Sequence, residues 1–358
     1  MIKVVILGEN GSVHIQKWIQ ALALHKILEL HVISFDRGVK YPEVKYYPLK
    51  IFFNNKIDYF LNVKRVNKYI KEIKPMLVHS HYATSYGYLG MKSNFHPFLV
   101  TGWGADIFDS PKEAIMRQLL IRIFKKADAI TVLSRITLKE MKKLSPKPVE
   151  LIPFGVDISK FRNIKSKNDN IIRIGTIRTL SEKYGVEYLI RAFAMLSHKY
   201  TNIRLEIVGD GPLKPKLISL ANELKISDKV TFHGYVNQNA DFDKYIQILS
   251  NLDIFAILSI LDSETFGVAA VEASACSIPV VATHVGGLPE VIENNVTGLL
   301  VKPCDAEDTA QALEKLIKDE NLRMQMGSNG RKKVENEYDW DKNVNKMISI
   351  YQQLTKQT

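Results

Sequence analysis

The sequence predicts an α/β protein with two domains, each built on a doubly wound parallel sheet. Its 358 residues suffice for two domains of about 150–180 residues, and 46% hydrophobic with 24% charged residues is an ordinary globular composition. Short apolar runs that end in glycine-containing or polar loops alternate with helical patterns through most of the chain. The polar stretch 163–170 interrupts this alternation and is interpreted as the linker.

The first domain opens with a strand, a glycine loop, a helix and a second strand. Residues 2–7 are the first apolar run, residues 14–28 have a helical pattern, and residues 30–35 form the next strand. Gly8 and Gly11 in the loop do not complete the three-glycine fingerprint of dinucleotide-binding proteins. This disfavours a nicotinamide oxidoreductase, and it leaves open whether Gly11 only permits the turn or also contributes to binding.

Residues 50–74 alternate aromatic and basic side chains. Val66, Ile70 and Ile73 fit one helical stripe, and lysines occupy the other positions of the helix. These lysines form either the solvated face of an ordinary helix or, with Phe52 nearby, a surface that docks on a membrane. Residues 112–126 repeat the pattern, so the same two interpretations apply there.

Two strands of the first domain end in polar motifs. The strand at 76–80 leads into His81, and the strand at 98–101 leads into Trp103 and Asp106. Ligands of open parallel sheets bind at the carboxyl ends of strands, so these side chains are candidates for a binding site. A single histidine at a strand end is also often structural. Two more strands complete this half of the chain, at 129–133 and 149–153.

The second domain begins with a strand at 171–175, after which come Arg178 and Lys183. Two cations near a strand end are often plain surface residues, but this position before a helix is also where such sheets bind ligands. Further strands are expected at 205–208, 230–232, 252–258 and 297–301, and a helix at 305–318.

The motif Asp241-Phe242-Asp243 permits two interpretations. Paired aspartates hold divalent ions in some nucleotide-sugar enzymes, whereas Asp241 just before a helix at 245–249 also suits an N-cap. The capping interpretation is preferred, and no metal site is predicted.

Residues 262–301 are the stretch around which the second domain is organised. Glu264 and Glu272 flank a Phe266-Gly267 turn, and an apolar helix is expected to begin near residue 265 or 266. The free N–H groups at such a helix end bind anions. Glu272 is expected about two turns, or ~9 Å, farther along, where its carboxylate can accept bonds from two ribose hydroxyls. A carboxylate in so apolar a helix needs a partner.

The net charge of +11 lies entirely in the first half of the chain. Residues 1–157 carry 24 Lys and Arg against 13 Asp and Glu, and the remaining residues carry 25 of each. Such an asymmetry suits a polyanion: a nucleic acid, an acidic polysaccharide or an anionic membrane surface. No nucleic-acid-binding module accompanies the charge, so nucleic acid is not expected as a partner. The N-terminus does not read as a signal peptide, and a cytoplasmic protein with peripheral attachment to the membrane is expected.

Taken together, the motifs resemble those of the retaining glycosyltransferases of family four, also called glycosyl transferases group 1. The resemblance covers nearly the whole chain, and it is most specific from Glu264 to Val301. It implies a GT-B fold, with two Rossmann-like domains facing across a cleft. The implied domains are 1–157 together with a C-terminal helix at about 340–358 that crosses back, and 158–339.

The resemblance also implies roles for individual residues. Its catalytic residues would be Arg178, Lys183 and Glu264. Donor-binding residues would be Glu272, Phe266, Gly267, Val268, Gly11 and Ser12. The acceptor side would contain His81, Trp103 and Asp106. Two departures from the family pattern are Trp103, where many members have histidine, and Tyr184, which is an extra residue between Lys183 and Gly185.

The expected function is retaining transfer of a sugar from a UDP- or GDP-type donor, with no metal or other cofactor. The acceptor would be a glycan, a lipid-linked glycan or a lipid at the cytoplasmic membrane face, in a pathway such as polysaccharide biosynthesis. Alternatives on the same scaffold are a nucleotide-sugar epimerase and a phosphorylase. Alternatives of other classes are the nicotinamide oxidoreductase and a non-catalytic binding subunit.

Overall fold

The structure is a computed structural model that describes residues 1–35, 38–108, 110–164, 169–238 and 240–356. The chain forms two compact units. The first contains Met1–Pro153 and Asp341–Thr358, and the second contains Phe154–Trp340. Most of the predicted linker, residues 165–168, lies outside the described residues.

The first unit is built on a parallel sheet in the order β3-β2-β1-β4-β5-β6-β7. Its strands are β1 (Ile2–Leu7), β2 (Leu28–Phe35), β3 (Lys45–Leu49), β4 (Leu77–His81), β5 (Phe98–Gly102), β6 (Ala129–Val132) and β7 (Val149–Leu151). The central strands are covered on both faces, which is why they read as continuous apolar runs. In β1, for example, Val4 to Leu7 are all fully buried.

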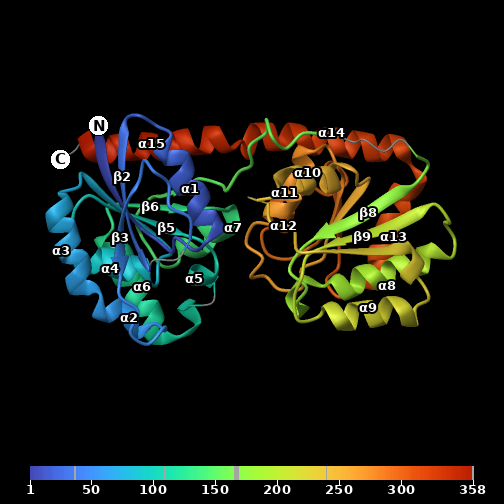
Figure 1. The fold of residues 1–358 in the computed structure, drawn as a ribbon, viewed down its shortest axis with the longest axis horizontal. Helices are drawn as coiled ribbons and strands as arrows, with labels where there is room; N and C mark the ends of the chain where they lie inside the picture. Colours follow the sequence, from blue (N-terminus) through green and yellow to red (C-terminus); the bar gives the residue numbers. More distant parts are fainter. Residues whose placement is uncertain (36–37, 109, 165–168, 239, 357–358) are drawn as a thin grey trace. The chain divides into compact units, whose positions relative to one another are not determined.

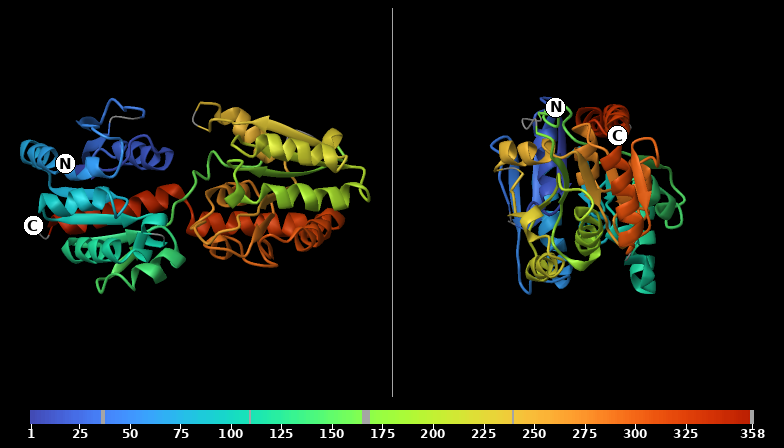
Figure 2. Two further views of the ribbon diagram at one scale, coloured as in Figure 1. Left: turned by 90° about the horizontal axis from the view of Figure 1, so that it is seen from below. Right: turned by 90° about the vertical axis from the view of Figure 1, so that its right-hand side faces the viewer.

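Helices cover both faces of this sheet, as Figures 1 and 2 show. Helices α1 and α15 lie on one side, and α3, α4 and α6 lie on the other (Figure 1). The helices are α1 (Val13–Ala23), α2 (Ile57–Leu61), α3 (Val63–Ile73), α4 (Tyr86–Ser93), α5 (Ala105–Phe108), α6 (Ala114–Lys126), α7 (Arg135–Met141) and α15 (Trp340–Lys356). The predicted apolar stripe of α3 is confirmed, because Val66, Ile70 and Ile73 are buried.

The second unit is built on a parallel sheet in the order β10-β9-β8-β11-β12-β13. Its strands are β8 (Ile172–Ile177), β9 (Ile203–Val208), β10 (Val230–Gly234), β11 (Ile254–Ile257), β12 (Val280–Thr283) and β13 (Gly298–Val301). Its helices are α8 (Val186–Ser197), α9 (Lys214–Glu223), α10 (Phe242–Ser250), α11 (Val268–Ala275), α12 (Leu288–Val291), α13 (Ala306–Lys318) and α14 (Glu320–Glu337). The predicted α/β class with two doubly wound Rossmann-like sheets is confirmed.

The C-terminal helix α15 belongs to the first unit by its packing. Its Tyr351 is fully buried, and the Tyr351 hydroxyl lies 2.6 Å from Nδ1 of His79 in β4. Nε2 of the same ring lies 2.7 Å from Oγ1 of Thr101 in β5. A fully buried polar ring is therefore satisfied on both sides, and it connects the end of the chain to the centre of the sheet.

Some element boundaries differ from the sequence prediction. Helix α1 ends at Ala23 rather than at residue 28, because its buried stripe stops at Leu22 and the next buried residue, Leu28, begins β2. The edge strand β3 was not predicted. Its first residue, Lys45, is exposed and it contains Pro48, so it lacks the continuous apolar signal of the inner strands.

Candidate active site

The main cluster of charged residues lies where the strand order of the second unit reverses. Strands β8 and β11 are neighbours, and the connections after them lead to opposite sides of the sheet. A crevice at the carboxyl ends of such a strand pair is the usual ligand site of this architecture. Arg178 directly follows β8, and Ser259 lies two residues beyond β11. The two elements therefore deliver their side chains to one point.

Arg178, Ser259 and Glu264 form a hydrogen-bonded triangle at this point. Nη2 of Arg178 donates to Oγ of Ser259 at 3.2 Å and to the Glu264 carboxylate. The Ser259 hydroxyl donates to Oε2 of Glu264 at 2.9 Å. The side chains of Arg178 and Glu264 are only 11% and 15% exposed, so either charge alone would be costly to bury. The prediction that Arg178 and Glu264 share a site is consistent with this geometry.

Arg178 keeps hydrogen-bonding capacity for a ligand. Its guanidinium carries five N–H donors, and the two bonds described above both use Nη2. The Nε atom is buried and has no hydrogen-bond partner among the described residues. An unsatisfied cationic donor at the end of a strand is a natural contact for phosphate oxygens.

Lys183 and Tyr184 complete the cationic side of the site. The Arg178 guanidinium lies 4.0 Å from the centre of the Tyr184 ring, and the Lys183 amine lies 4.7 Å from it. The tyrosine that departs from the family pattern therefore contacts both cations. Lys183 and Tyr184 line a cavity of about 70 Å³ together with Ser259 and Glu264.

A glycine pair shapes the loop that carries Glu264. The Gly287 N–H donates to the Glu264 carbonyl at 2.8 Å, and the Gly286 N–H donates to Oδ1 of Asp262 at 3.0 Å. Gly286 has φ +53°, and a Cβ atom there would stand 2.1 Å from the Glu264 carbonyl oxygen. Only glycine fits this position without moving the loop.

Helix α11 begins at Val268, later than the predicted residue 265 or 266. Gly267 precedes it with φ +80°, a left-handed conformation that delays the helix. The backbone N–H groups of Phe266, Gly267 and Val268 have no acceptor among the described residues. The Phe266 ring is buried 5.4 Å from the Tyr338 ring, so only its backbone is available to a ligand. The helix end is consistent with the predicted anion site.

Glu272 is buried and has the partners that its apolar surroundings require. It lies one turn after the first residue of α11, not the predicted two, and is 4% exposed. Its carboxylate accepts from Nε2 of Gln238 at 2.8 Å and from the Tyr245 hydroxyl. Burial, followed by the Glu272 charge, raises the pKa of Tyr245 well above its ordinary value, so Tyr245 remains a donor. Nothing in the sequence indicated Gln238 or Tyr245 except that Glu272 needed a partner.

The first unit has an equivalent reversal of strand order between β1 and β4. The loop after β1 contains Gly11 and Ser12, and β4 ends at His81. The Ser12 N–H donates to the Glu9 carbonyl at 2.9 Å, and the Gly11 N–H lies 3.4 Å from Oε1 of Glu9. Ser12 occupies the N-cap position of α1 without a side-chain capping bond. Both candidates therefore lie in a compact turn at a position suited to ligands.

His81 and Trp103 lie together in a cluster of aromatic rings. Their ring centroids are 5.8 Å apart, and His14 lies 6.0 Å from Trp103 on its other side. His81 is buried, and neither of its ring nitrogens has a hydrogen-bond partner among the described residues. Burial lowers the pKa of His81 to about 3, so the ring is neutral at neutral pH. His14 was not identified from the sequence, because a helical histidine gives no distinctive signal.

Asp106 positions the loop that carries Trp103. Its fully buried carboxylate accepts from the N–H groups of Trp103, Gly104 and Ala83 at 3.0, 2.7 and 2.7 Å. Burial raises the pKa of Asp106, and these backbone bonds oppose the increase. Asp106 thus connects two strand-end loops, and its acceptor-side role stays a prediction.

The Asp241 motif does not behave as predicted. Asp241 stands at the N-cap position of α10, which begins at Phe242, but its side chain makes no capping hydrogen bond. Its φ of −125° and ψ of +46° differ from the extended conformation that usually directs a capping side chain. Among the described residues, no group of three or more His, Cys, Asp or Glu side chains is arranged to hold a metal.

Two family descriptions match the chain. Glycosyl transferases group 1 matches residues 157–333, and Glycosyl transferase 4-like matches residues 3–134. N-acetyl-alpha-D-glucosaminyl L-malate synthase of Bacillus anthracis is 27% identical over 293 residues, 77% of this chain and 74% of that protein. A Corynebacterium glutamicum protein named GDP-mannose-dependent monoacylated alpha-(1-6)-phosphatidylinositol monomannoside mannosyltransferase is 30% identical over 254 residues, 66% of this chain and 65% of that protein.

Solved structures show the same fold over the full length. Anabaena HepE in complex with UDP superposes with a TM-score of 0.81 at 19% identity, covering 99% of this chain and 100% of that one. Among three of the most similar relatives, the matched segment spans between 47% and 94% of the relative's length. The fold and the two family matches define a glycosyltransferase of the GT-B class. The chain belongs to the group 1 glycosyl transferases, as the sequence motifs predicted.

Proposed function

We propose that this protein is a retaining, metal-independent glycosyltransferase that takes a sugar from a UDP- or GDP-type donor. The observation that carries the proposal is the set of anion-binding groups at the strand reversal of the second unit. Arg178 has spare donors, Lys183 lies beside it, and the amides before α11 have no acceptor among the described residues. These groups suit the diphosphate of a nucleotide sugar.

The proposed reaction needs stabilisation of charge on the leaving group. As the bond between the sugar C1 and the phosphate oxygen breaks, Arg178, Lys183 and the helix N–H groups stabilise the negative charge that develops on the diphosphate. The acceptor oxygen forms its bond to C1 on the same face, and its proton passes to the departing phosphate oxygen. Glu264 contacts the transferred sugar, and Glu272 binds the ribose.

The proposed acceptor is a lipid or lipid-linked glycan at the cytoplasmic membrane face. The excess positive charge of residues 1–157 supports attraction to an anionic surface. Phe52 and Phe53, which flank the basic segment, are 52% and 64% exposed. The Corynebacterium relative is named for a phosphatidylinositol-linked acceptor, which also supports the proposal. Within the described ranges, no helix is both long and apolar enough to cross a bilayer.

The first experiment is a thermal-shift panel with UDP, GDP, ADP and NADH. A ligand at a hundred times its dissociation constant adds ~2.7 kcal/mol of stability, which moves a melting temperature by several degrees. We expect a shift with UDP or GDP and none with NADH. A shift with NADH alone would refute the transferase assignment and favour the oxidoreductase.

The anomeric configuration of the product then tests the retaining mechanism. We expect NMR of the glycoside, made from the donor that shifts the melting temperature, to show the same configuration as the donor. An inverted product would exclude the proposed front-face attack. Supplying L-malate and a phosphatidylinositol-containing vesicle in parallel separates a small-acid acceptor from a lipid acceptor. Transfer only to L-malate would contradict the membrane part of the proposal.

A further inference from the structure

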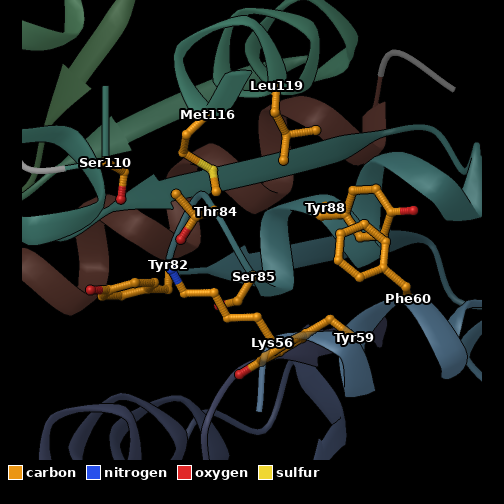
Figure 3. Close-up of a pocket in the computed structure, with 10 residues that line it drawn as sticks. All are labelled: Lys56, Tyr59, Phe60, Tyr82, Thr84, Ser85, Tyr88, Ser110, Met116 and Leu119. Carbon is orange, nitrogen blue, oxygen red and sulfur yellow. The ribbon is translucent and has the colours of Figure 1, made fainter. Parts of the chain in front are cut away.

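The first unit contains an apolar cavity that the proposed chemistry does not use. It has a volume of about 240 Å³ and lies between α2, α4 and α6 (Figure 3). Its apolar lining consists of Tyr59, Phe60, Tyr82, Tyr88, Met116 and Leu119. Figure 3 shows Met116 and Leu119 reaching into it from α6, opposite the rings of Phe60 and Tyr88. Those two rings pack with centroids 4.8 Å apart and form one wall.

Two of the helices that line this cavity, α2 and α6, also carry exposed apolar side chains. On the α2 side, Phe60 and its helix neighbour Ile57 are 54% and 51% exposed. On the α6 side, Ile115, which directly precedes Met116 of the lining, is 86% exposed. Large apolar side chains exposed on helices that line an apolar cavity are costly in water. They are favourable where these helices face the acyl region of a bilayer.

A lysine lies among these apolar residues. Lys56 lines the cavity, and Figure 3 shows its side chain extending toward Tyr82. It forms no ion pair with any described residue. The nearby carboxylate of Asp58 instead accepts from the N–H groups of Phe52, Phe53 and Asn54. An apolar cavity with one unpaired cation has the chemistry to bind an aliphatic chain that ends in an anionic group.

The cavity adjoins the candidate acceptor side of the first unit. Tyr82, one of its walls, directly follows His81 at the end of β4. Tyr82 has φ +79°, a strained conformation for a residue other than glycine. It is held there by bonds from its own N–H to the Thr101 carbonyl and from the Gly87 N–H to its carbonyl, both 3.0 Å. Non-glycine strain of this kind concentrates at functional sites.

We propose that this cavity binds part of the aliphatic chain of a phosphorylated lipid acceptor, with Lys56 contacting the phosphate. The proposal rests on the proposed glycosyltransferase function and specifies its acceptor class. The cavity is smaller than the roughly 300–1,000 Å³ of sites that enclose a whole drug-sized ligand. It therefore takes a segment of the chain, and the exposed apolar side chains of α2 and α6 contact the rest of the lipid.

The test measures binding of dodecyl phosphate, butyl phosphate and dodecanol by calorimetry, below their micellar concentrations. We expect dodecyl phosphate to bind at least tenfold more tightly than either of the other two, because only it has both the chain and the phosphate. Leu119→Trp, which fills the cavity, should lower the affinity for dodecyl phosphate at least tenfold. Lys56→Met should lower the affinity for dodecyl phosphate to the affinity for dodecanol. Lys64→Met, an exposed lysine of α3, is the matched control and should have no effect.

Each variant is also tested for its UDP or GDP thermal shift, which reports on the second unit. An unchanged nucleotide shift shows that the variant is folded and that the donor site is intact. If no nucleotide shifts even the wild-type protein, the glycosyltransferase proposal fails by itself. Equal affinities for dodecyl and butyl phosphate, or unimpaired binding in Leu119→Trp, would overturn the lipid-chain proposal. If wild type bound maltotriose but not dodecyl phosphate, and Leu119→Trp lost the maltotriose binding, the cavity would be a glycan site and the lipid-chain proposal would be wrong.

Discussion

The two sheets of this protein reverse their strand order in the same way, but the two reversal points hold different chemistry. In the second unit, the ends of β8 and β11 bring together an arginine, a lysine and a glutamate. In the first unit, helix α1 after β1, the end of β4 and the loop after β5 bring together the rings of His14, His81 and Trp103, of which His81 is buried. The fold determines where a ligand can bind, and the side chains at each point determine which ligand is suitable.

This difference indicates a division of labour. The second unit offers charges and N–H groups that suit a diphosphate, whereas the first offers neutral rings and an adjacent apolar cavity. Burial lowers the pKa of His81 to about 3, and desolvation by neighbouring groups, followed by the charge of Lys17, lowers the pKa of His14. Neutral imidazoles accept and donate hydrogen bonds without attracting anions. The reversal point of the first unit is therefore better suited to a hydroxyl group of the acceptor than to a phosphate.

The largest expected effect comes from removing Lys183. The variant Lys183→Ala should lower kcat by about a hundredfold or more, because a charge that stabilises the leaving group is lost. The Lys183 side chain is exposed, so the melting temperature should change little. Lys216→Ala, which removes an exposed lysine 3.3 Å from Glu187, is the control and should retain full turnover. Near-normal turnover in Lys183→Ala would remove Lys183 from the site.

A smaller effect, about tenfold, is expected at the ribose. Glu272→Gln should raise the donor KM and reduce discrimination against the 2′-deoxy form of the donor, because an amide accepts a weaker bond than a carboxylate. Kinetics with the two donors, in wild type and variant, give the comparison. Tyr245→Phe removes one of the groups that position Glu272 and should lower the free energy of unfolding by about 1–3 kcal/mol. Undiminished discrimination in Glu272→Gln would show that Glu272 does not bind the ribose.

The sequence predicted the local features well because they depend on neighbouring residues. The apolar run of β1 and the stripe of α3 are properties of short segments, and both were found where expected. The approach of Arg178 to Glu264 was implied by family resemblance, since the two residues are 86 positions apart. Gln238 and Tyr245 could not be predicted as partners of Glu272, because their contacts depend on how α10 and the loop before it lie against α11. The contacts of the extra residue Tyr184 with Arg178 and Lys183 also could not be predicted from the sequence.

A pH titration extends the comparison to the first unit. The pKa of His81 is lowered from 6.5 in the unfolded chain to about 3 in the folded one. Above pH 6.5 both states are neutral, and below it only the unfolded state takes up the proton. The stability associated with neutral His81 is therefore lost as the pH falls from 6.5 toward 3, by about 1.4 kcal/mol per pH unit. We expect the free energy of unfolding in urea to fall between pH 6.5 and pH 5.0. In His81→Phe this fall should be about 2 kcal/mol smaller than in wild type.

The buried neighbour His79 also has a pKa well below its ordinary value, through burial and then His81. The free energy of unfolding of wild type should therefore decrease at acidic pH by more than one histidine accounts for. His81→Phe should still show the part of this decrease that is due to His79. A pH dependence of unfolding that is identical in His81→Phe and wild type would show that His81 takes up its proton equally in both states. Such a result would remove the contrast between neutral rings at the reversal point of the first unit and charged groups at that of the second.

The smallest expected effect is that of metal removal. If Arg178, Lys183 and the amides before α11 stabilise the leaving diphosphate, then EDTA should leave kcat unchanged within about twofold. The measurement is sugar transfer with and without EDTA, and then with added Mg²⁺ or Mn²⁺. Lys183→Ala provides the sharper form of the test, because a bound cation could partly replace the lost charge. Rescue of that variant by Mg²⁺, with wild type indifferent to it, would show that the protein's own cations do the work of the metal. If EDTA abolished the activity of wild type and Mn²⁺ restored it, the reaction would instead require a metal at the diphosphate.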